Sequence, residues 1–167
     1  MRAVVQRVSR EVVRVGEKTV GEIGAGLCVL VGVSHTDGPA DAHRMAAKLA
    51  NLRLFEDGAA AMNRSVVDVG GGVLVVSQFT LYGDATGGRR PSWSAAAPRD
   101  HARPLVEGVV AGLRELGLNV ATGSFGDDMQ VELVNDGPVT VLVEVPPAGT
   151  GGTGRNRLNS SALEHLG

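Results

Sequence analysis

Leu27-Cys28-Val29-Leu30-Val31-Gly32-Val33 is an almost continuous run of apolar residues. A short run of this kind, rich in aliphatic side chains and preceded by the turn sequence Gly24-Ala25-Gly26, is typical of a strand buried on both faces of a sheet. Cys28 is expected to pack within it as a small apolar side chain, because free cysteines are mostly buried. The stretch therefore predicts a layered domain built around a central buried strand.

Further short, Val-rich segments flank this run on both sides. Val73–Val76 follows Gly70-Gly71-Gly72 and predicts a second buried strand, which ends at Ser77. Near the end of the domain, two predicted strands flank Asn135-Asp136-Gly137-Pro138. The composition of this segment indicates a hairpin or a tight connection. The remaining strands are expected at residues 3–8, 11–15, 19–23, 129–134 and 139–145.

Two segments carry apolar residues at helical spacing. One helix is expected to start near Asp37-Gly38-Pro39 and to run to about Leu52, and the other to run from about Arg99 to Gly117. The apolar stripe of the second helix contains Leu105, Val109, Leu113 and Leu116. Two helices cannot cover both faces of a sheet with this many strands, so the pattern predicts a layered α/β domain with some sheet-on-sheet packing.

Composition indicates an ordinary globular domain. The chain has 167 residues, of which 43% are hydrophobic and 20% charged, and its net charge of −2 provides no overall field that would attract nucleic acid. No apolar run approaches the ~20 residues of a membrane helix, and Met1–Val8 does not resemble a signal peptide, so a cytoplasmic protein is expected. Residues 146–167 contain a run of Gly, Thr and Ala and are expected to form a flexible tail after a domain of residues 1–145.

Several kinds of catalytic site lack support in the sequence. The four histidines have no metal-ligand spacing and Cys28 is the only cysteine, so no metal is expected. The glycine-rich stretches match neither a phosphate-binding loop nor a dinucleotide fingerprint. Ser77 and Thr80 carry the candidate nucleophilic hydroxyl groups of a hydrolase. The sequence has no nucleophile elbow, however, and no spacing identifies a general base for either.

The remaining candidates are ambiguous when each is taken alone. Ser77-Gln78-Phe79-Thr80-Leu81 lies where a buried strand ends and is either a ligand-binding segment or an ordinary polar strand end. Gly137-Pro138 fits a plain turn, in which a trans bond is far more common. The loop with Arg89, Arg90 and Trp93 is either solvated or a weak RNA-binding patch, as are the arginines of the first strands, Arg2, Arg7, Arg10 and Arg14.

Together, two segments resemble the signature motifs of the D-aminoacyl-tRNA deacylase family. Ser77–Leu81 is similar to its Ser-Gln-x-Thr-Leu motif, and Asn135–Thr140 to its Asn-x-Gly-Pro-Val-Thr motif. The resemblance covers about residues 1–145, and the tail from Pro146 resembles no segment of the family. It extends to flanking segments at Met1–Val8, Gly21–Val33, Gly88–Ser92 and Phe125–Met129.

The resemblance implies a fold, an activity and an assembly. The fold would have mostly antiparallel strands, with two main helices on one side of the packed sheets. The activity would be hydrolysis of the ester at the 3′ end of D-aminoacyl-tRNA, without a cofactor, by a homodimer with active sites at its interface. A cis Gly137-Pro138 from the partner subunit would exclude L-amino acids by steric clash, so glycyl-tRNA would also be a substrate.

Roles for individual residues follow from the same resemblance. Ser77, Gln78, Phe79 and Thr80 would line the catalytic pocket, with backbone N–H groups as oxyanion donors. The terminal adenosine would be packed by Phe125 and Met129. Thr80 would be either the nucleophile or a positioning group, with the ribose 2′-hydroxyl assisting the reaction. The alternatives are a non-catalytic RNA-binding module and an esterase that is L-selective or not stereoselective.

Overall fold

The predicted central strand is β3 (Gly26–Gly32), and every residue in it except Leu30 is buried. In the computed structural model, which describes residues 1–148, β3 lies between β1 (Arg2–Val15) and β6 (Gly72–Ser77). It pairs antiparallel with β1 and parallel with β6. The apolar run therefore decides the fold as expected, because only a strand between two others can bury both faces and both edges.

The sheet has six strands and is mostly antiparallel. Its order is β2-β1-β3-β6-β7, and β8 (Gln130–Glu144) pairs with the other edge of β1. β2 (Lys18–Ile23) and β8 run antiparallel to β1, whereas β7 (Asn119–Thr122) runs parallel to β6. The predicted α/β architecture is confirmed.

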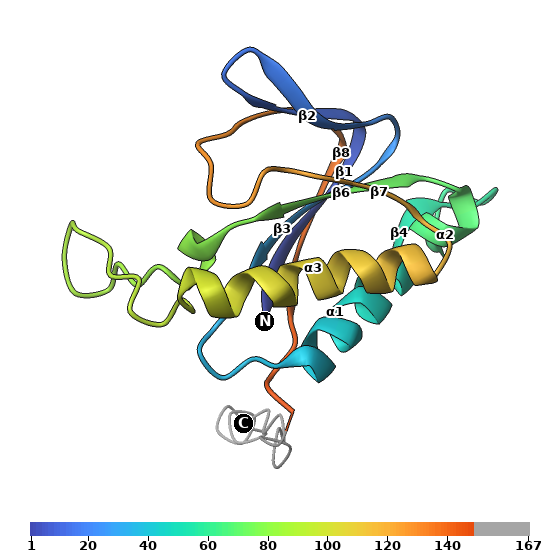
Figure 1. The fold of residues 1–167 in the computed structure, drawn as a ribbon. Helices are drawn as coiled ribbons and strands as arrows, with labels where there is room; N and C mark the ends of the chain where they lie inside the picture. The colour runs from blue at the N-terminus through green and yellow to red at the C-terminus, as the bar shows by residue number, and fades with distance from the viewer. Residues whose placement is uncertain (149–167) are drawn as a thin grey trace, which may run out of the picture.

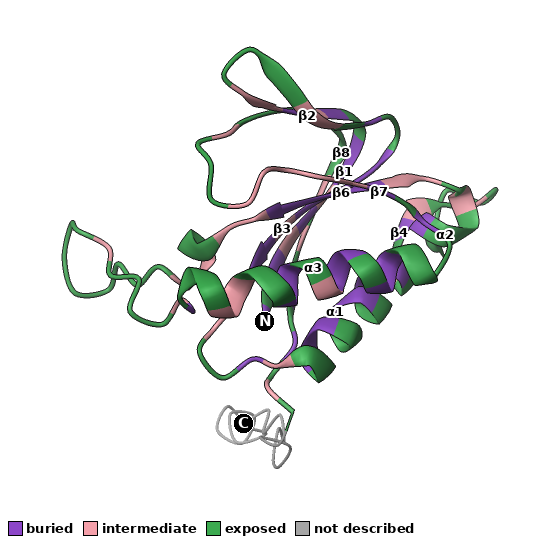
Figure 2. Ribbon diagram, viewed as in Figure 1, coloured by how far each residue is buried: buried purple, intermediate pink, exposed green. Residues whose placement is uncertain are grey.

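Two helices cover one face of this sheet (Figure 1). The parallel strands require crossover connections, and these contain α1 (Pro39–Asn51) and α3 (Arg99–Glu115). Figure 2 shows that the buried stripes of both helices face the sheet. Within the predicted stripe of α3, Leu116 is an exception, because it is the C-cap and is exposed. The main core contains Val5, Leu27, Val29, Met45, Leu49, Val73, Val75, Val109 and Leu113.

The other face of the sheet is covered by the sheet itself. The second half of β1 curls over with β2 and part of β8, and a second core forms around Val8, Val13, Ile23, Cys28, Leu74 and Val76. Gly21 marks the close approach of β2 to β7, because a Cβ atom there would lie 2.4 Å from the Thr122 carbonyl oxygen. The sheet is nearly closed, which is the sheet-on-sheet packing that the sequence predicts.

Two strand predictions are wrong in the same way. The expected break at Ser9-Arg10 does not occur, and β1 is one continuous strand. The expected hairpin at Asn135-Asp136-Gly137-Pro138 is also absent, because β8 continues through it along β1. The turn-forming residues are accommodated as a bulge instead of a reversal. The sequence interpretation also missed short elements: β4 (Arg53–Glu56), β5 (Met62–Ser65), α2 (Val66–Val69) and β7.

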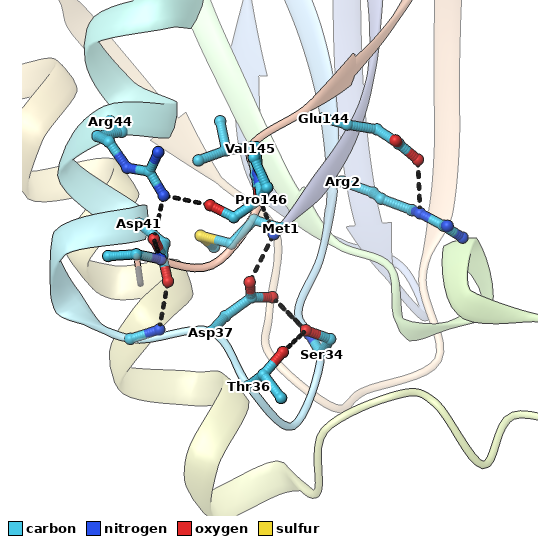
Figure 3. Close-up of polar contacts among 12 residues, drawn as sticks. Met1, Arg2, Ser34, Thr36, Asp37, Asp41, Arg44, Glu144, Val145 and Pro146 are labelled. Carbon is cyan, nitrogen blue, oxygen red and sulfur yellow. Dashed lines mark hydrogen bonds and ion pairs between the residues drawn. The ribbon is translucent and has the colours of Figure 1, made fainter. Parts of the chain in front are cut away.

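A buried polar cluster holds the ends of the domain together (Figure 3). The α-amino group of Met1 donates to Asp37 Oδ1 at 2.6 Å and to the Val145 carbonyl at 2.7 Å, and the Met1 and Asp37 side chains are fully buried. The second oxygen of Asp37 accepts from the backbone N–H of Ser34 at 2.7 Å. These contacts tie the start of β1 to the residue after β8 and to the loop before α1.

The predicted tail begins against α1. The Ala148 N–H donates to the buried Asp41 carboxylate at 2.8 Å, and Arg44 contacts both Asp41 and the Pro146 carbonyl. The rest of the predicted tail, residues 149–167, lies outside the described residues. Within the described part of the chain, no helix is long and apolar enough to span a bilayer.

Candidate functional site

A pocket of about 670 Å³ opens where β6 ends. Ser77, Gln78 and Phe79 form one wall, and Phe125 and Met129 lie in the segment that follows β7. The structure thus brings together five of the eight residues expected from the sequence. Thr80, Gly137 and Pro138 are not among the residues that line it.

The first signature segment leaves the sheet at Gln78. Ser77 is the last residue of β6 and pairs with Val31, and the Gln78 N–H donates to the Val31 carbonyl at 2.7 Å. The chain then forms the short 3₁₀ helix η1 (Phe79–Tyr82). A short helix leaves its first N–H groups without partners inside the helix, so the amides of Phe79 and Thr80 are available to a ligand.

The side chains of η1 face different surroundings. Phe79 is 58% exposed, although it lines the pocket, and it meets Trp93 edge-to-face with 6.1 Å between ring centroids. Thr80 is exposed, and its hydroxyl is hydrogen bonded to the side-chain amide of Gln78. Tyr82 is half-buried, and burial raises the pKa of its hydroxyl.

The opposite wall comes from the start of α3 and the segment after β7. Arg99 lies in the first turn of α3 and donates to the Gly126 carbonyl at 2.6 Å, which fixes that segment against the helix. Met129 is held by its sulfur, which accepts from the Ser124 N–H at 3.2 Å. The sequence did not identify α3 as part of the pocket. The available signal was the predicted start of this helix near Arg99, shortly after the first signature segment.

The second signature segment projects from β8 as a bulge. Gln6 pairs with Thr140 and Val8 with Asn135, so a single residue of β1, Arg7, lies opposite four residues of β8. The Gly137-Pro138 bond is cis, as the resemblance implies and contrary to the plain-turn interpretation. Gly137 has φ +129°, a conformation that residues with a side chain rarely adopt.

Arg7 anchors this bulge from inside the domain. Its side chain is buried, and its Nε donates to the Asp136 carbonyl at 3.0 Å and lies 3.3 Å from the Asp136 carboxylate. Its Nη1 donates to the Leu54 carbonyl at 2.6 Å. Both sequence interpretations of Arg7, a solvated face or an RNA contact, are therefore wrong.

The other arginines of β1 are engaged with carboxylates at the surface. Arg10 and Arg14 both pair with Glu132, at 2.9 and 3.1 Å, and Arg2 pairs with Glu144 at 2.8 Å. These pairs are exposed, and such surface ion pairs contribute little to stability. Within residues 1–148, no three His, Cys, Asp or Glu side chains gather closely enough to hold a metal ion.

Comparison with known proteins assigns the chain to a family. The family model described as D-Tyr-tRNA(Tyr) deacylase matches residues 4–144. The chain belongs to this family. It is 62% identical over 144 residues to the D-aminoacyl-tRNA deacylase of Heliobacterium modesticaldum, covering 86% of this chain and 96% of that one. The D-aminoacyl-tRNA deacylase of Thermus aquaticus is 56% identical, with 86% and 95% covered.

Solved structures agree on the fold. A protein described as c-Myc DNA Unwinding Element Binding Protein superposes with a TM-score of 0.82 at 40% identity, over 87% of this chain and 99% of that one. A probable eukaryotic D-amino acid tRNA deacylase superposes with a TM-score of 0.75 at 16% identity, over 86% and 98%, and this likeness bears on the fold alone. The predictions of the family and of a hydrolase are confirmed.

Proposed function

We propose that the chain hydrolyses the ester that links a D-amino acid to the 3′-terminal ribose of tRNA. The observation that carries this is the pocket at the end of β6, where the first signature segment meets Phe125 and Met129 in a member of the deacylase family. An aminoacyl ester is already activated, so orientation of water and stabilisation of the oxyanion suffice for catalysis.

The pocket offers complementary chemistry to the two parts of this substrate. Phe79, Phe125 and Met129 give an apolar wall suited to the terminal adenine. The N–H group of Phe79, which lines the pocket, is the first proposed oxyanion donor, and that of Thr80, the next residue of η1 beside the pocket, is the second.

Stereoselectivity is proposed to come from a partner subunit. Gly137 and Pro138 project from β8 outside the pocket of their own chain, which suits a role in the pocket of a second copy. Their backbone would occupy the space required by an L side chain, while glycine, with no side chain, would be accepted. A homodimer that removes mischarged D-amino acids and glycine in the cytoplasm, where charged tRNA is used, completes the proposal.

The test is the discharge of tRNA charged with D-tyrosine, L-tyrosine or glycine at matched concentrations. Rapid loss of the D-tyrosyl and glycyl esters, with L-tyrosyl-tRNA spared, is the expected result. Equal loss of both tyrosyl esters would keep the hydrolase and remove the filter. Intact esters on tRNA that nevertheless binds would favour a non-catalytic RNA-binding module, and a monomer in sedimentation would remove the partner's contribution.

Thr80→Ala is expected to retain turnover within about tenfold of the parent, because the Thr80 hydroxyl bonds to Gln78 and not to a general base. Single-turnover discharge of D-tyrosyl-tRNA measures this, with Thr19→Ala at an exposed position of β2 as the control. A loss of about a thousandfold or more would instead identify Thr80 as the nucleophile.

A further inference from the structure

A second hollow, of about 380 Å³, continues from the first along the flank of α3. The two hollows share Ser77, Val106 and Phe125 as lining residues, so they adjoin at these side chains. In Figure 1, α3 lies beneath β6 and β7. Val75 and Ser77 of β6 and Thr122 of β7 line the hollow opposite α3. The second hollow therefore lies next to the first, within reach of a ligand that extends beyond the first.

The charges of the two hollows differ. Among the described residues, the first is lined by one arginine, Arg99, and two carboxylates, Asp127 and Asp128. The second is lined by two arginines, Arg103 and Arg114, and one carboxylate, Glu107. A phosphate is therefore favoured in the second hollow over the first.

Arg103 lines the second hollow beside Phe125. Its guanidinium carbon lies 5.3 Å from the centroid of the Phe125 ring, which lines both hollows. Its ion pair with Glu107 is long, at 3.7 Å, and both side chains are mostly exposed. Such an exposed pair contributes little, so the guanidinium is free to exchange Glu107 for a phosphate.

The rest of the second hollow suits a nucleobase. Val106, Val110 and Phe125 provide an apolar surface, and Thr122 provides a hydroxyl group. The Ser124 hydroxyl also lines the hollow and donates to Asp127. Single-stranded RNA is recognised by this combination of a flat apolar contact, polar groups at the base edge and an arginine on the backbone.

We propose that the second hollow binds the nucleotide that precedes the terminal adenosine of the substrate tRNA, and that Arg103 binds the phosphate joining the two. The inference rests on the proposed function, which places the terminal adenosine in the first hollow. Arg103 is then a binding residue for the 3′ strand, and it distinguishes a polynucleotide substrate from a single charged nucleoside.

The test compares two substrates that differ only in the presence of this phosphate: D-tyrosyl-tRNA and D-tyrosyl-adenosine. Arg103→Ala is expected to raise KM for D-tyrosyl-tRNA about tenfold with little change in kcat, and to reduce the salt dependence of binding by about one phosphate contact. Its kcat/KM for D-tyrosyl-adenosine should stay within about twofold of the parent. Arg53→Ala on β4, outside the lining of either hollow, is the matched control.

Two results would overturn the proposal. An unchanged KM for D-tyrosyl-tRNA would show that Arg103 binds no phosphate, and an equal loss with both substrates would show that it only supports Phe125. Failure of the proposed function is recognised separately, because the parent protein would then discharge neither substrate.

Discussion

Replacing Arg7 with methionine is expected to lower both the stereoselectivity of the protein and its stability. Arg7 holds Asp136, next to Gly137, through the carbonyl and the carboxylate, and it also donates to the Leu54 carbonyl. Methionine retains the length and apolar stem but has no donor, so these acceptors lose a buried partner. We expect a loss of about 2–4 kcal/mol in the free energy of unfolding.

The effect on selectivity follows from the proposed filter. If the bulge of one subunit excludes L side chains from its partner's pocket, a loosened bulge should lower the ratio of D- to L-tyrosyl-tRNA discharge at least tenfold, which is about 1.4 kcal/mol. Discharge assays and urea unfolding measure the two effects. Arg10→Met is the control, because Arg10 lies on the same strand but pairs with Glu132 at the surface. A destabilised variant with undiminished selectivity would limit Arg7 to a structural role.

The parts of the fold that could be predicted are those in which local pattern and burial agree. The apolar runs of β3 and β6 and the stripes of α1 and α3 have one satisfactory environment each, and the structure provides it. Asn135–Pro138 failed as a hairpin because its turn preference is local, whereas pairing with β1 on both sides of it is a long-range effect. β7 is only four residues long, too short for its periodicity to be recognised.

The site residues could be predicted only with the help of the family resemblance. What the sequence could not predict about the site has physical reasons. Ser77 and Gln78 could be placed at a strand end, but their meeting with Phe125 depends on how α3 returns the chain to β7. Arg7 could not be recognised as buried, because an arginine in a strand is usually exposed and its partners are backbone carbonyls far along the chain. Sequence patterns do not encode such contacts.

Glu11 is a buried ionisable group that the proposed function does not use. It lies on β1 between the two layers of the sheet, is fully buried, and neither of its carboxylate oxygens has a hydrogen-bond partner among the described residues. Burial raises the pKa of Glu11 from its ordinary value of 4.5 to about 7, and the nearby Cys28 thiol offsets this only in part. Burial, followed by the proximity of Glu11, also raises the pKa of Cys28, so the thiol stays protonated.

This arrangement predicts a protein that becomes less stable as the pH rises from 5 to 8. The folded state holds the Glu11 proton more tightly than the unfolded chain does, so the stabilisation is complete below pH 4.5 and is lost as the pH passes through 7. At about 1.4 kcal/mol per pKa unit, the loss between pH 5 and pH 8 is about 2–3 kcal/mol. Carboxyls with lowered pKa values, such as those of Asp57 and Asp68, change their charge only at lower pH and so do not contribute to this loss.

Glu11→Gln is therefore expected to remove most of this pH dependence and to be more stable than the parent at pH 8, because a neutral amide costs less to bury than a carboxylate. The measurement is urea unfolding at pH 5, 6, 7 and 8, at one protein concentration so that any association is held constant. Glu22→Gln, an exposed change on the neighbouring strand β2, should keep the parent's slope. If Glu11→Gln keeps that slope as well, the carboxylate is already ionised in the folded protein at neutral pH, and the layers of the sheet must admit water or a cation to it.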